Sequence, residues 1–564
     1  MQTQNSRIFK ISHPNIELQS ELSQGLGISR TLSQLLINRG INNNIEAKNF
    51  LKADLKSLLD PFDFSGMKKA VGLVQEAKKK KQKVMLFGDY DVDGITSIAL
   101  LKSVLIKLGF NVSHYIPHRI KEGYGLNKQA VNFAKKQGIK LVITVDCGTN
   151  SPKEIKELKR SKIKVIVTDH HQPLGDKDLE ADAVINPKLK KSGYAFKDLA
   201  GVGVAYKFCQ ALTGQELFEE LDLVALGTIA DVVPLRGENR IIVKEGLKQL
   251  SNNRRQGILA LIENSRLRKK EMTVEFVSFI LGPRINASGR MDTAETALKL
   301  MMTSDKDEAD ILAKTLESFN RQRQKIEEQI MSEAQDLISR EINFKEHKVI
   351  VVAKEDWHHG VLGVVASKLA DRFYRPTVVI SMDKEVCKGS ARSIKNFHLF
   401  DALTDCQQFL TTFGGHEHAA GLTISRNRIK HFRDRINTLA SERLSLEDLF
   451  PKIEIDLELD FADLTTQIIE ELKLLEPFGV GNPEPLFLTR NLKLKSEIAV
   501  MGRDTIKFWV TDGIYTYQAL GFGMGRFKES FLQAEGFDLV YTPKIDNWQG
   551  RNQIILEIKD VSLR

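Results

Sequence analysis

Between residues 83 and 168 the chain alternates short apolar segments with segments of helical periodicity, and this alternation limits the folds it can adopt. The apolar segments are KVMLFG (83–88), VSHYIP (112–117), KLVITV (140–145) and KVIVT (164–168). Each has the length and composition of a buried strand, and the intervening segments place apolar residues at helical spacing. Strands that alternate with helices in this way predict a parallel sheet covered by helices.

Acidic residues and histidines follow three of the four predicted strands. In chain order they are Asp89, Asp91, Asp93, Asp146, Asp169, His170 and His171. One aspartate after a strand is often only a helix N-cap. Three clusters at neighbouring strand ends are different, because ligands of open α/β sheets bind outside the carboxyl ends of the strands. Asp231 lies at the end of the helix-like part of a further apolar segment (223–235). By itself it could be explained as a helix cap.

The alternate aspartates at 89, 91 and 93, followed by Gly94, match the first half of an EF-hand calcium loop. Leu100 stands where that loop needs a bidentate Glu, and a strand precedes the motif where an EF-hand has a helix, so this interpretation fails. Carboxylates with one or two imidazoles suit Mg²⁺ or Mn²⁺ better than zinc. The donors exceed the needs of one ion, whereas two ions about 3.5–4 Å apart would use them and could hydrolyse a phosphate ester. The residues therefore predict a two-metal phosphoesterase.

The remaining sequence divides into regions of different pattern. We expect a polar helical leader, a catalytic α/β domain, a linking helix, a second α/β domain and a small β-barrel, at 1–60, 61–304, 305–345, 346–445 and 446–564. The barrel is expected because apolar and polar residues alternate there as in short antiparallel strands.

Lys plus Arg number 82 against 73 Asp plus Glu, a net charge of +9 that favours a polyanionic partner but equally fits a solvated surface. The run AKKKKQK (77–83) fits a nucleic-acid patch less well than a helix end, where lysines complement the helix dipole. Four cysteines without C-x-x-C spacing fit a reducing cytoplasm. We see no signal peptide and no apolar run of about 18 residues, so we expect a cytoplasmic protein without membrane contact.

Several motifs carry a family resemblance. DYDVDG, TVDCGTN, TDHHQP and LGTIADVVPL, which begin at residues 89, 144, 168 and 226, resemble the four motifs of the DHH phosphoesterase superfamily. FGGHEHAAG (413–421) resembles the glycine-rich segment of the accompanying DHHA1 domain. GPRINASGRM, WHHGVLGVVASKL and LEPFGVGNPEPLF, which begin at 282, 357 and 475, are similar to motifs of the bacterial RecJ family of exonucleases.

The resemblance implies an α/β fold in which a parallel-sheet DHH domain and a smaller DHHA1 domain are joined by a long helix, followed by an OB-fold. It implies a metal-dependent exodeoxyribonuclease that uses two divalent cations, Mn²⁺ or Mg²⁺. Such an enzyme degrades single-stranded DNA from its 5′ end, releases 5′ mononucleotides, and acts in DNA recombination and repair. The implied partners are single-strand binding protein and a helicase, and the implied state is a monomer.

The resemblance also implies roles for individual residues. The implied metal ligands are Asp91, Asp93, Asp146, His170 and Asp231, with Asp146 as the bridge between ions. Asp89 would bind or orient a ligand, Asp169 would hold His170 by a hydrogen bond, and His171 would contact the scissile phosphate or assist the leaving oxygen. Arg119, Ser390 and Arg392 would hold the 5′ phosphate, and the implied further substrate contacts are Arg284, Asn286, Arg290 and His416.

Two other interpretations remain open at this point. A small-molecule or short-oligonucleotide DHH phosphoesterase would share the acidic motifs, but such chains are usually shorter and lack the C-terminal barrel. A non-catalytic DNA-binding replication scaffold would share the fold, but here every ligand position is filled.

Overall fold

The computed structural model describes residues 8–175, 179–252, 255–265, 272–383, 386–502, 504–546 and 553–564. They form two compact units. The first comprises Asp60–Val233 and Glu245–Pro451, and the second Arg7–Leu59, Pro234–Lys244 and Lys452–Arg564. None of the described helices combines the length and the apolar composition that a membrane crossing requires.

The N-terminal half of the first unit is built on a five-stranded, fully parallel sheet in the order β3-β2-β4-β5-β6. Its strands are β2 (Val84–Gly88), β3 (Val112–Tyr115), β4 (Leu141–Val145), β5 (Lys164–Thr168) and β6 (Ala183–Ile185). The four strands expected from the sequence are all present, and β6 adds a short edge strand.

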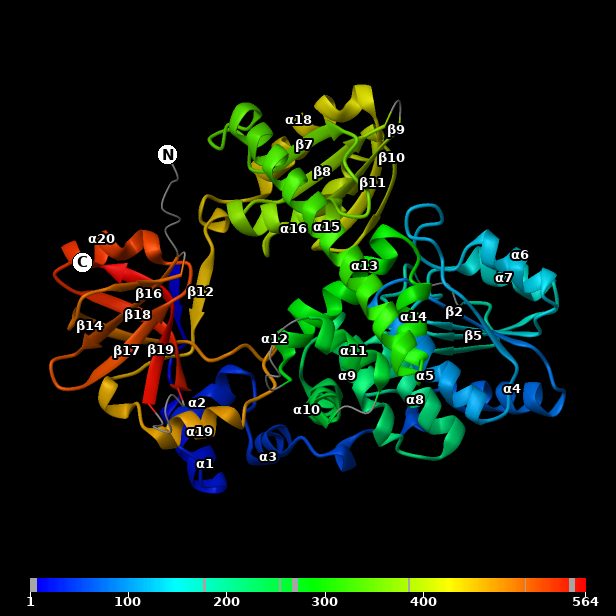
Figure 1. Ribbon diagram of the computed structural model, residues 1–564, viewed down its shortest axis with the longest axis horizontal. Helices are drawn as coiled ribbons and strands as arrows, with labels where there is room; N and C mark the ends of the chain where they lie inside the picture. Colours follow the sequence, from blue (N-terminus) through cyan, green and yellow to red (C-terminus); the bar gives the residue numbers. More distant parts are fainter. Residues whose placement is uncertain are drawn as a thin grey trace. The chain divides into compact units, whose positions relative to one another are not determined.

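Helices cover both faces of this sheet (Figure 1). Helices α6 (Lys128–Lys136) and α7 (Pro152–Arg160) share a core cluster with alternate residues of β2, β4 and β5, such as Phe87 and Val165. On the other face, α5 (Val92–Lys107) packs so closely on β2 that a Cβ at Gly88 would lie 2.7 Å from Ile98 Cδ1. The remaining helices of this half are α4 (Met67–Lys79), α8 (Gly201–Thr213), α9 (Leu221–Ala230), α11 (Gln256–Asn264), α12 (Val274–Phe276), α13 (Gly282–Met291) and α14 (Glu295–Met302).

A 36-residue helix, α15 (Lys306–Glu341), leads to the second sheet of this unit. That sheet has the order β10-β11-β9-β8-β7, in which only the β7–β8 pair is parallel. Its strands are β7 (Ile350–Glu355), β8 (Thr377–Met382), β9 (Val386–Arg392), β10 (Leu410–Gly415) and β11 (Ala419–Ser425). Its helices are α16 (Leu362–Phe373), α17 (Leu399–Thr404) and α18 (Ile429–Arg443).

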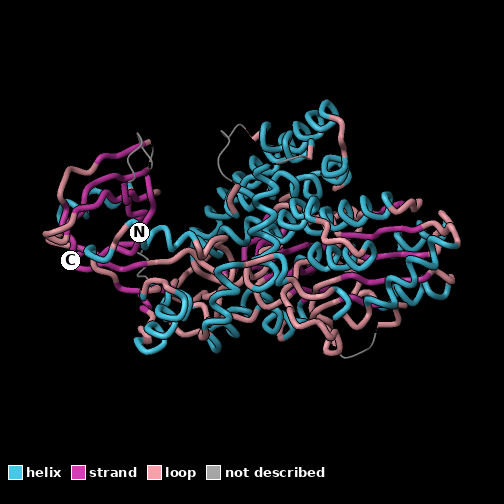
Figure 2. The backbone as a smooth tube through the Cα atoms, turned by 90° about the horizontal axis from the view of Figure 1, so that it is seen from below, coloured by secondary structure: helices cyan, strands magenta, loops and turns pink. Residues whose placement is uncertain are grey.

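The second unit contains a barrel whose strands are drawn in magenta in Figure 2. Five of them close a ring in the order β14-β18-β19-β17-β16, because β16 also pairs with β14. Only the β17–β19 pair in this ring is parallel. The ring strands are β14 (Phe487–Leu494), β16 (Thr505–Thr511), β17 (Thr516–Gly521), β18 (Phe537–Asp546) and β19 (Gln553–Leu563), and β13 (Leu457–Glu458) and β15 (Ala499–Met501) extend it. Helices α19 (Thr466–Lys473) and α20 (Lys528–Gln533) accompany the barrel. A partly open five-stranded barrel is the architecture of the OB-fold.

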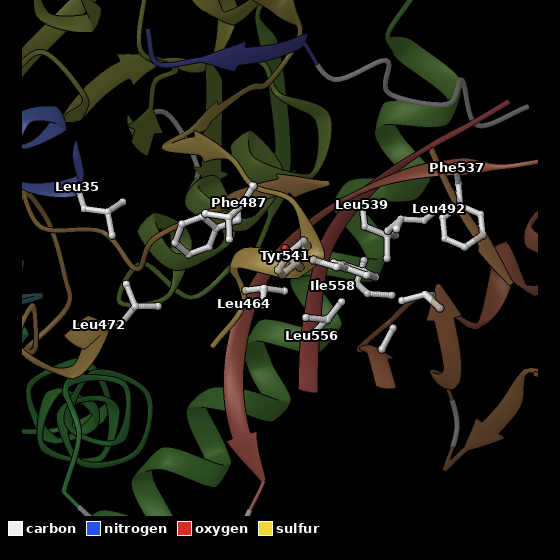
Figure 3. Close-up of a cluster of buried hydrophobic side chains, with 14 of the residues drawn as sticks. Leu35, Leu464, Leu472, Phe487, Leu492, Phe537, Leu539, Tyr541, Leu556 and Ile558 are labelled. Atoms are coloured by element: carbon white, nitrogen blue, oxygen red, sulfur yellow. The ribbon is translucent and has the colours of Figure 1, made fainter. Parts of the chain in front are cut away.

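The N-terminal leader belongs to this second unit and does not form a region of its own. Strand β1 (Ile8–Ile11) pairs in parallel with β12 (Lys452–Ile455). Helices α1 (Ile16–Leu26), α2 (Arg30–Asn38) and α3 (Asn44–Lys52) follow it. Leu35 of α2 lies in one apolar cluster with Phe487 and Tyr541 of the barrel (Figure 3). An amphipathic pattern indicates that a helix has an apolar face, but it does not say which distant segment covers it.

A buried arginine ties three distant parts of the second unit together. Arg240 lies in α10 (Gly237–Asn252), whose residues up to Lys244 belong to this unit, and its side chain is 1% exposed. Its guanidinium donates to the carbonyl oxygens of Phe50 (2.9 Å), Leu474 (2.9 Å) and Leu475 (2.7 Å) and lies 4.0 Å from the Phe50 ring centroid. The motif that begins at residue 475 thus receives a structural explanation.

Replacing this arginine tests the connection. Arg240→Ala leaves buried carbonyl oxygens without donors, so it should destabilise the second unit by about 3 kcal/mol or more. Faster hydrogen–deuterium exchange of β14 and β18 amides would report the loss. Arg236→Ala is the matched control. Arg236 is exposed, and within the described chain its side chain donates one hydrogen bond, from Nε to the Gly481 carbonyl. Equal exchange in the two variants would contradict the assigned role.

Candidate metal and nucleic-acid site

The polar clusters of the sequence meet at the carboxyl edge of the parallel sheet. Asp89 follows β2, Asp146 follows β4, and Asp169 follows β5, and these three strands are adjacent. Asp146 has a φ of 56°, a left-handed conformation that Asp tolerates better than most residues. Its carboxylate lies against the start of α8, where a Cβ at Gly201 would be 2.6 Å from Asp146 Oδ1.

Backbone amides fix the two aspartates that begin α5. Asp91 is the N-cap of α5, and its Oδ1 accepts from the Gly94 N–H at 3.0 Å. Asp93 accepts from the Gly201 N–H through Oδ2 and from the Val202 N–H through Oδ1, both at 2.7 Å. These bonds hold both carboxylates in position at the sheet edge.

His170 is the point at which the clusters converge. Its Nε2 lies 3.2 Å from Asp146 Oδ1, 3.5 Å from Asp231 Oδ2 and 3.8 Å from Asp93 Oδ2. Within the described chain, three sets of side chains bring ligand atoms within 4.8 Å of one another: Asp89, Asp91 and Asp146; Asp93, His170 and Asp231; and Asp146, His170 and His171. Asp146 and His170 each belong to two of these sets.

The donor chemistry of this cluster fits divalent cations. Five buried atoms of this cluster have no hydrogen-bond partner among the described residues: Asp89 Oδ1, Asp146 Oδ1, His170 Nδ1, His170 Nε2 and Asp231 Oδ2. Buried polar atoms are normally hydrogen-bonded, and leaving one unpaired is costly. Carboxylate oxygens and an imidazole nitrogen that face one another without donors are suitable ligands for Mg²⁺ or Mn²⁺.

The electrostatics of the cluster point the same way. Burial and the neighbouring carboxylates raise the pKa values of Asp89, Asp93, Asp146 and Asp231, that of Asp93 to about 7. Burial, together with the charge of His171, lowers the pKa of His170 to about 3. A neutral His170 has a lone pair free for a cation, and a cation would offset the repulsion between the carboxylates.

Asp169 holds a different histidine from the one expected. Its Oδ1 accepts from His171 Nδ1 at 2.8 Å, whereas it meets His170 only through the backbone N–H, at 2.7 Å. Its Oδ2 accepts from the Thr149 N–H. Burial opposes ionisation of Asp169, but the hydrogen bond from His171 lowers its pKa, and the same bond raises the pKa of His171 against the effect of burial. Asp169 therefore favours a protonated His171.

Tyr124 was not among the residues singled out from the sequence. Its hydroxyl lies 3.1 Å from His171 Nδ1 and 3.3 Å from the Asp146 carbonyl oxygen. Gly123 and Gly125, with φ values of 80° and 83°, flank it and turn the loop. The sequence signal that could have identified Tyr124 is the pair of glycines that flanks this aromatic residue.

Arginines gather beside the metal cluster. Arg119 lies over the Tyr90 ring, 4.7 Å from its centroid. Burial lowers the pKa values of Arg290 and Arg392, and the positive charge of Arg119 lowers both further, so the three lie close together. Among the described residues no ion pair neutralises any of the three. Three neighbouring arginines without ion-pair partners are suited to bind an anion.

The other expected substrate-contacting residues differ in how far their side chains are already engaged by other protein groups. Arg284 is engaged within the protein, because its Nε lies 2.8 Å from Glu317 Oε2 and its Nη1 donates to the Ile280 carbonyl. Asn286 Oδ1 accepts from the Val92 N–H at 3.2 Å and so supports the start of α5. Ser390 Oγ lies beside α16, at 3.1 Å from where a Cβ of Gly363 would be.

A pocket of about 190 Å³ opens next to Asp231. Its lining combines apolar and cationic side chains and includes Val232, Pro283, Val364, Asn286, Arg290 and Arg323. Val232 has a φ of 60° and is 62% exposed. This conformation is unusual for a β-branched residue, and such strain concentrates at functional sites.

Three family models match the chain: the DHH family N-terminal domain at residues 83–228, the DHHA1 domain at 346–442 and the RecJ OB domain at 455–560. The single-stranded-DNA-specific exonuclease RecJ of Bacillus subtilis is 39% identical over 558 residues, which cover 98% of this chain and 71% of that protein. The chain belongs to the RecJ family. RecJ of Escherichia coli is 35% identical over 480 residues, 81% of this chain and 82% of that protein.

Solved RecJ structures agree with this membership. RecJ from Thermus thermophilus in complex with Mn²⁺ has a TM-score of 0.85 and 28% identity, over 100% of this chain and 80% of that one. The exonuclease RecJ bound to manganese has a TM-score of 0.60 and 34% identity, over 70% of this chain and 100% of that one. These matches confirm the RecJ resemblance and the expected fold.

Metal binding should stabilise the protein in a pH-dependent way. The pKa of Asp93 is raised, so the metal-free native state holds a proton that the unfolded state releases, and its stability falls as the pH rises from about 4 to 7. Mn²⁺ replaces such protons, so the rise in melting temperature on adding Mn²⁺ should be larger at about pH 8 than at about pH 5.5.

Asp93→Asn should remove most of this Mn²⁺-induced rise. Asp182→Asn is the control, because Asp182 also accepts a backbone N–H, that of Val165, but lies beside the start of β5, away from the cluster. A Mn²⁺ effect that is unchanged in Asp93→Asn, or lost equally in both variants, would contradict the site.

Proposed function

We propose that this chain is a metal-dependent exonuclease that degrades single-stranded DNA from its 5′ end and releases 5′ mononucleotides. The observation that carries the proposal is the convergence of unpartnered carboxylates and a neutral histidine at one sheet edge, in a member of the RecJ family. The relatives are named as exonucleases specific for single-stranded DNA, and solved relatives contain Mn²⁺ or Mg²⁺.

We infer two divalent cations, Mn²⁺ or Mg²⁺. They would be held by Asp89, Asp91, Asp93, Asp146, His170 and Asp231, with Asp146 shared. When bound, such a pair activates water and stabilises the charge that develops on the phosphoryl group. The protein contributes the fixed geometry, since backbone amides hold Asp91 and Asp93 before any ligand arrives.

His171 is the residue placed to handle the leaving group. Asp169 orients its ring and favours its protonated form, and the Tyr124 hydroxyl lies beside it. In the reaction, water adds to phosphorus and the bond from phosphorus to the 3′ oxygen of the terminal nucleotide breaks. A protonated His171 can neutralise the charge on that oxygen or donate its proton to it.

The arginine cluster supplies a place for the terminal 5′ phosphate. Arg392 and Ser390 come from β9, and Arg119 comes from the loop after β3. Gly363 leaves room beside them, because a Cβ there would lie 3.5 Å from Arg392 Nη2. His416 is close enough to His171 for the two charges to interact, which supports its contact with the same nucleotide. A clamp at a fixed distance from the metals would make cleavage proceed one nucleotide at a time.

The pocket beside Asp231 would take the following part of the strand. Arg323 in its lining is paired with Glu327, but Arg290 offers a cation for phosphates, and Val232 and Pro283 offer apolar surface for a base or sugar. This combination favours a polynucleotide over a small phosphate ester, and so favours the exonuclease over the small-molecule phosphoesterase. A scaffold would have no need of the unpartnered metal ligands. Action in recombination and repair, with single-strand binding protein and a helicase as partners, stays a prediction.

A single-stranded oligonucleotide labelled at its 5′ end tests the reaction. With Mn²⁺ or Mg²⁺ the wild type should release labelled mononucleotide first, and EDTA should abolish release. Asp146→Ala should slow release by more than about 100-fold, because losing a second-sphere partner alone costs about 10–100-fold. Asp182→Asn serves again as the control. A strand that is bound but never cut with either metal would favour the scaffold instead.

The 5′-phosphate clamp makes a separate prediction. Arg392→Gln removes a charge-assisted hydrogen bond of about 1.5–3 kcal/mol. The KM for a 5′-phosphorylated strand should therefore rise about 10–100-fold, with little change for a 5′-hydroxyl strand. Arg426→Gln is the control, because Arg426 lies exposed in the same domain and pairs with Glu355. Equal effects on the two substrates would rule out recognition of the 5′ phosphate by Arg392.

A further inference from the structure

The opposite edge of the parallel sheet carries a concentration of positive charge that the catalytic reaction does not use. Each of α4, α6 and α7 ends just before the strand that follows it, so three connecting segments meet at the edge where β2, β4 and β5 begin. Their sequences are KKKKQK (78–83), KKQGIK (135–140) and KRSKIK (159–164). We call these three segments the lysine edge.

The backbone register places the segments side by side. The Lys140 N–H donates to the Lys83 carbonyl at 3.1 Å, and the Lys164 N–H donates to the Lys140 carbonyl at 2.9 Å. Neighbouring strands of a sheet are about 4.8 Å apart, so these three lysines form a row across the edge. The helix ends add lysines on both sides of the row, since α4 and α6 cover different faces of the sheet.

The positive charge of the lysine edge is largely uncompensated. All twelve Lys and Arg side chains of the three segments are exposed. The carboxylates that pair with them are Glu76, Glu157 and Asp182, which engage Lys80, Lys135, and both Lys159 and Lys164. Twelve positive charges against three carboxylates leave an excess of nine positive charges, which equals the net charge of +9 of the whole chain. Complementing the helix dipoles accounts for lysines in the last turns, but not for Lys81, Lys83, Lys140 and Lys162.

The lysine edge is separate from the metal cluster. Strands β2, β4 and β5 each run for five residues between the two edges. At about 3.3 Å per residue this separates the lysine edge from the carboxylates by roughly 17 Å. A single phosphate group therefore cannot contact both surfaces.

We propose that the lysine edge binds the phosphate backbone of duplex DNA next to the single strand that is degraded. The three segments contain no aromatic residue. Surfaces that hold single strands usually combine cations with aromatic stacking platforms, whereas contacts to a duplex backbone need no stacking platform. Duplex DNA also has the denser charge, one per about 1.7 Å of helix axis. Duplex binding would anchor the enzyme at a junction between single strand and duplex. This consequence for cleavage rests on the proposed exonuclease activity.

The test compares two sets of lysine substitutions of equal charge. The triple variant Lys81→Glu, Lys140→Glu and Lys162→Glu changes exposed positions in the turns of the lysine edge. The control variant Lys306→Glu, Lys345→Glu and Lys430→Glu changes exposed positions elsewhere in the first unit. Fluorescence anisotropy with EDTA present measures binding to a blunt duplex, a short single strand, and a duplex with a 5′ single-stranded overhang.

The lysine-edge variant should bind the duplex and the overhang substrate at least tenfold more weakly, with an unchanged Kd for the single strand. The slope of log Kd against log salt concentration should fall by about 2–3, since about 0.9 is lost per phosphate contact. The control variant should behave as wild type. Equal weakening for single strand and duplex would overturn the assignment to duplex, and no weakening would identify a solvated surface.

Because binding is measured without cleavage, these outcomes do not depend on the activity. If wild type cuts neither substrate with Mn²⁺, the proposed function fails while the duplex-binding result still stands. With cleavage intact, the lysine-edge variant should degrade the short single strand at the wild-type rate and lose rate only on the overhang substrate at low enzyme concentration.

Discussion

Repulsion between buried carboxylates at one edge of the parallel sheet is the constraint on which the site depends. Asp89, Asp93, Asp146 and Asp231 face one another with little water, and their pKa values rise accordingly. Such an arrangement is unfavourable by itself, because each charge opposes the ionisation of the next. The scaffold holds the arrangement with backbone donors, from Gly94, Gly201 and Val202, which do not titrate. The proposed ligands are therefore preorganised, and a bound cation would relieve their mutual repulsion.

At the same edge of the sheet, two adjacent histidines favour different protonation states. His170 is buried among metal ligands and remains neutral, whereas His171, one residue further on, is paired with Asp169 and favours its charged form. In the proposed mechanism, environment rather than residue type divides the work between a ligand and a proton donor. The Asp-His-His triplet would then be one short segment with three different tasks.

Sequence patterns were most informative where local chemistry decides the outcome. Strands such as 83–88 and 164–168 carry their own signal, and the acidic residues after them follow from the rule that parallel strands end at one edge. The contacts of Asp169 and Arg284 could not be read from the sequence, because they depend on the orientation of one side chain relative to its neighbours. Tyr124 and Val232 were missed for a related reason, since their importance lies in position and backbone conformation. Helices α1–α3 lie in the leader, but the barrel residues that share their apolar cluster are far away in the sequence.

That last feature affects how the chain is made. Helices α1–α3 leave the ribosome before the barrel, but Leu22, Leu32 and Leu35 share one apolar cluster with barrel residues such as Phe487 and Tyr541. At about 5–20 residues per second, the barrel strands are completed more than about 20 s later. During that interval the leader exposes an apolar face while the first unit, encoded between the two parts, can already fold. We therefore expect the second unit to assemble late, by docking of the leader onto the completed barrel.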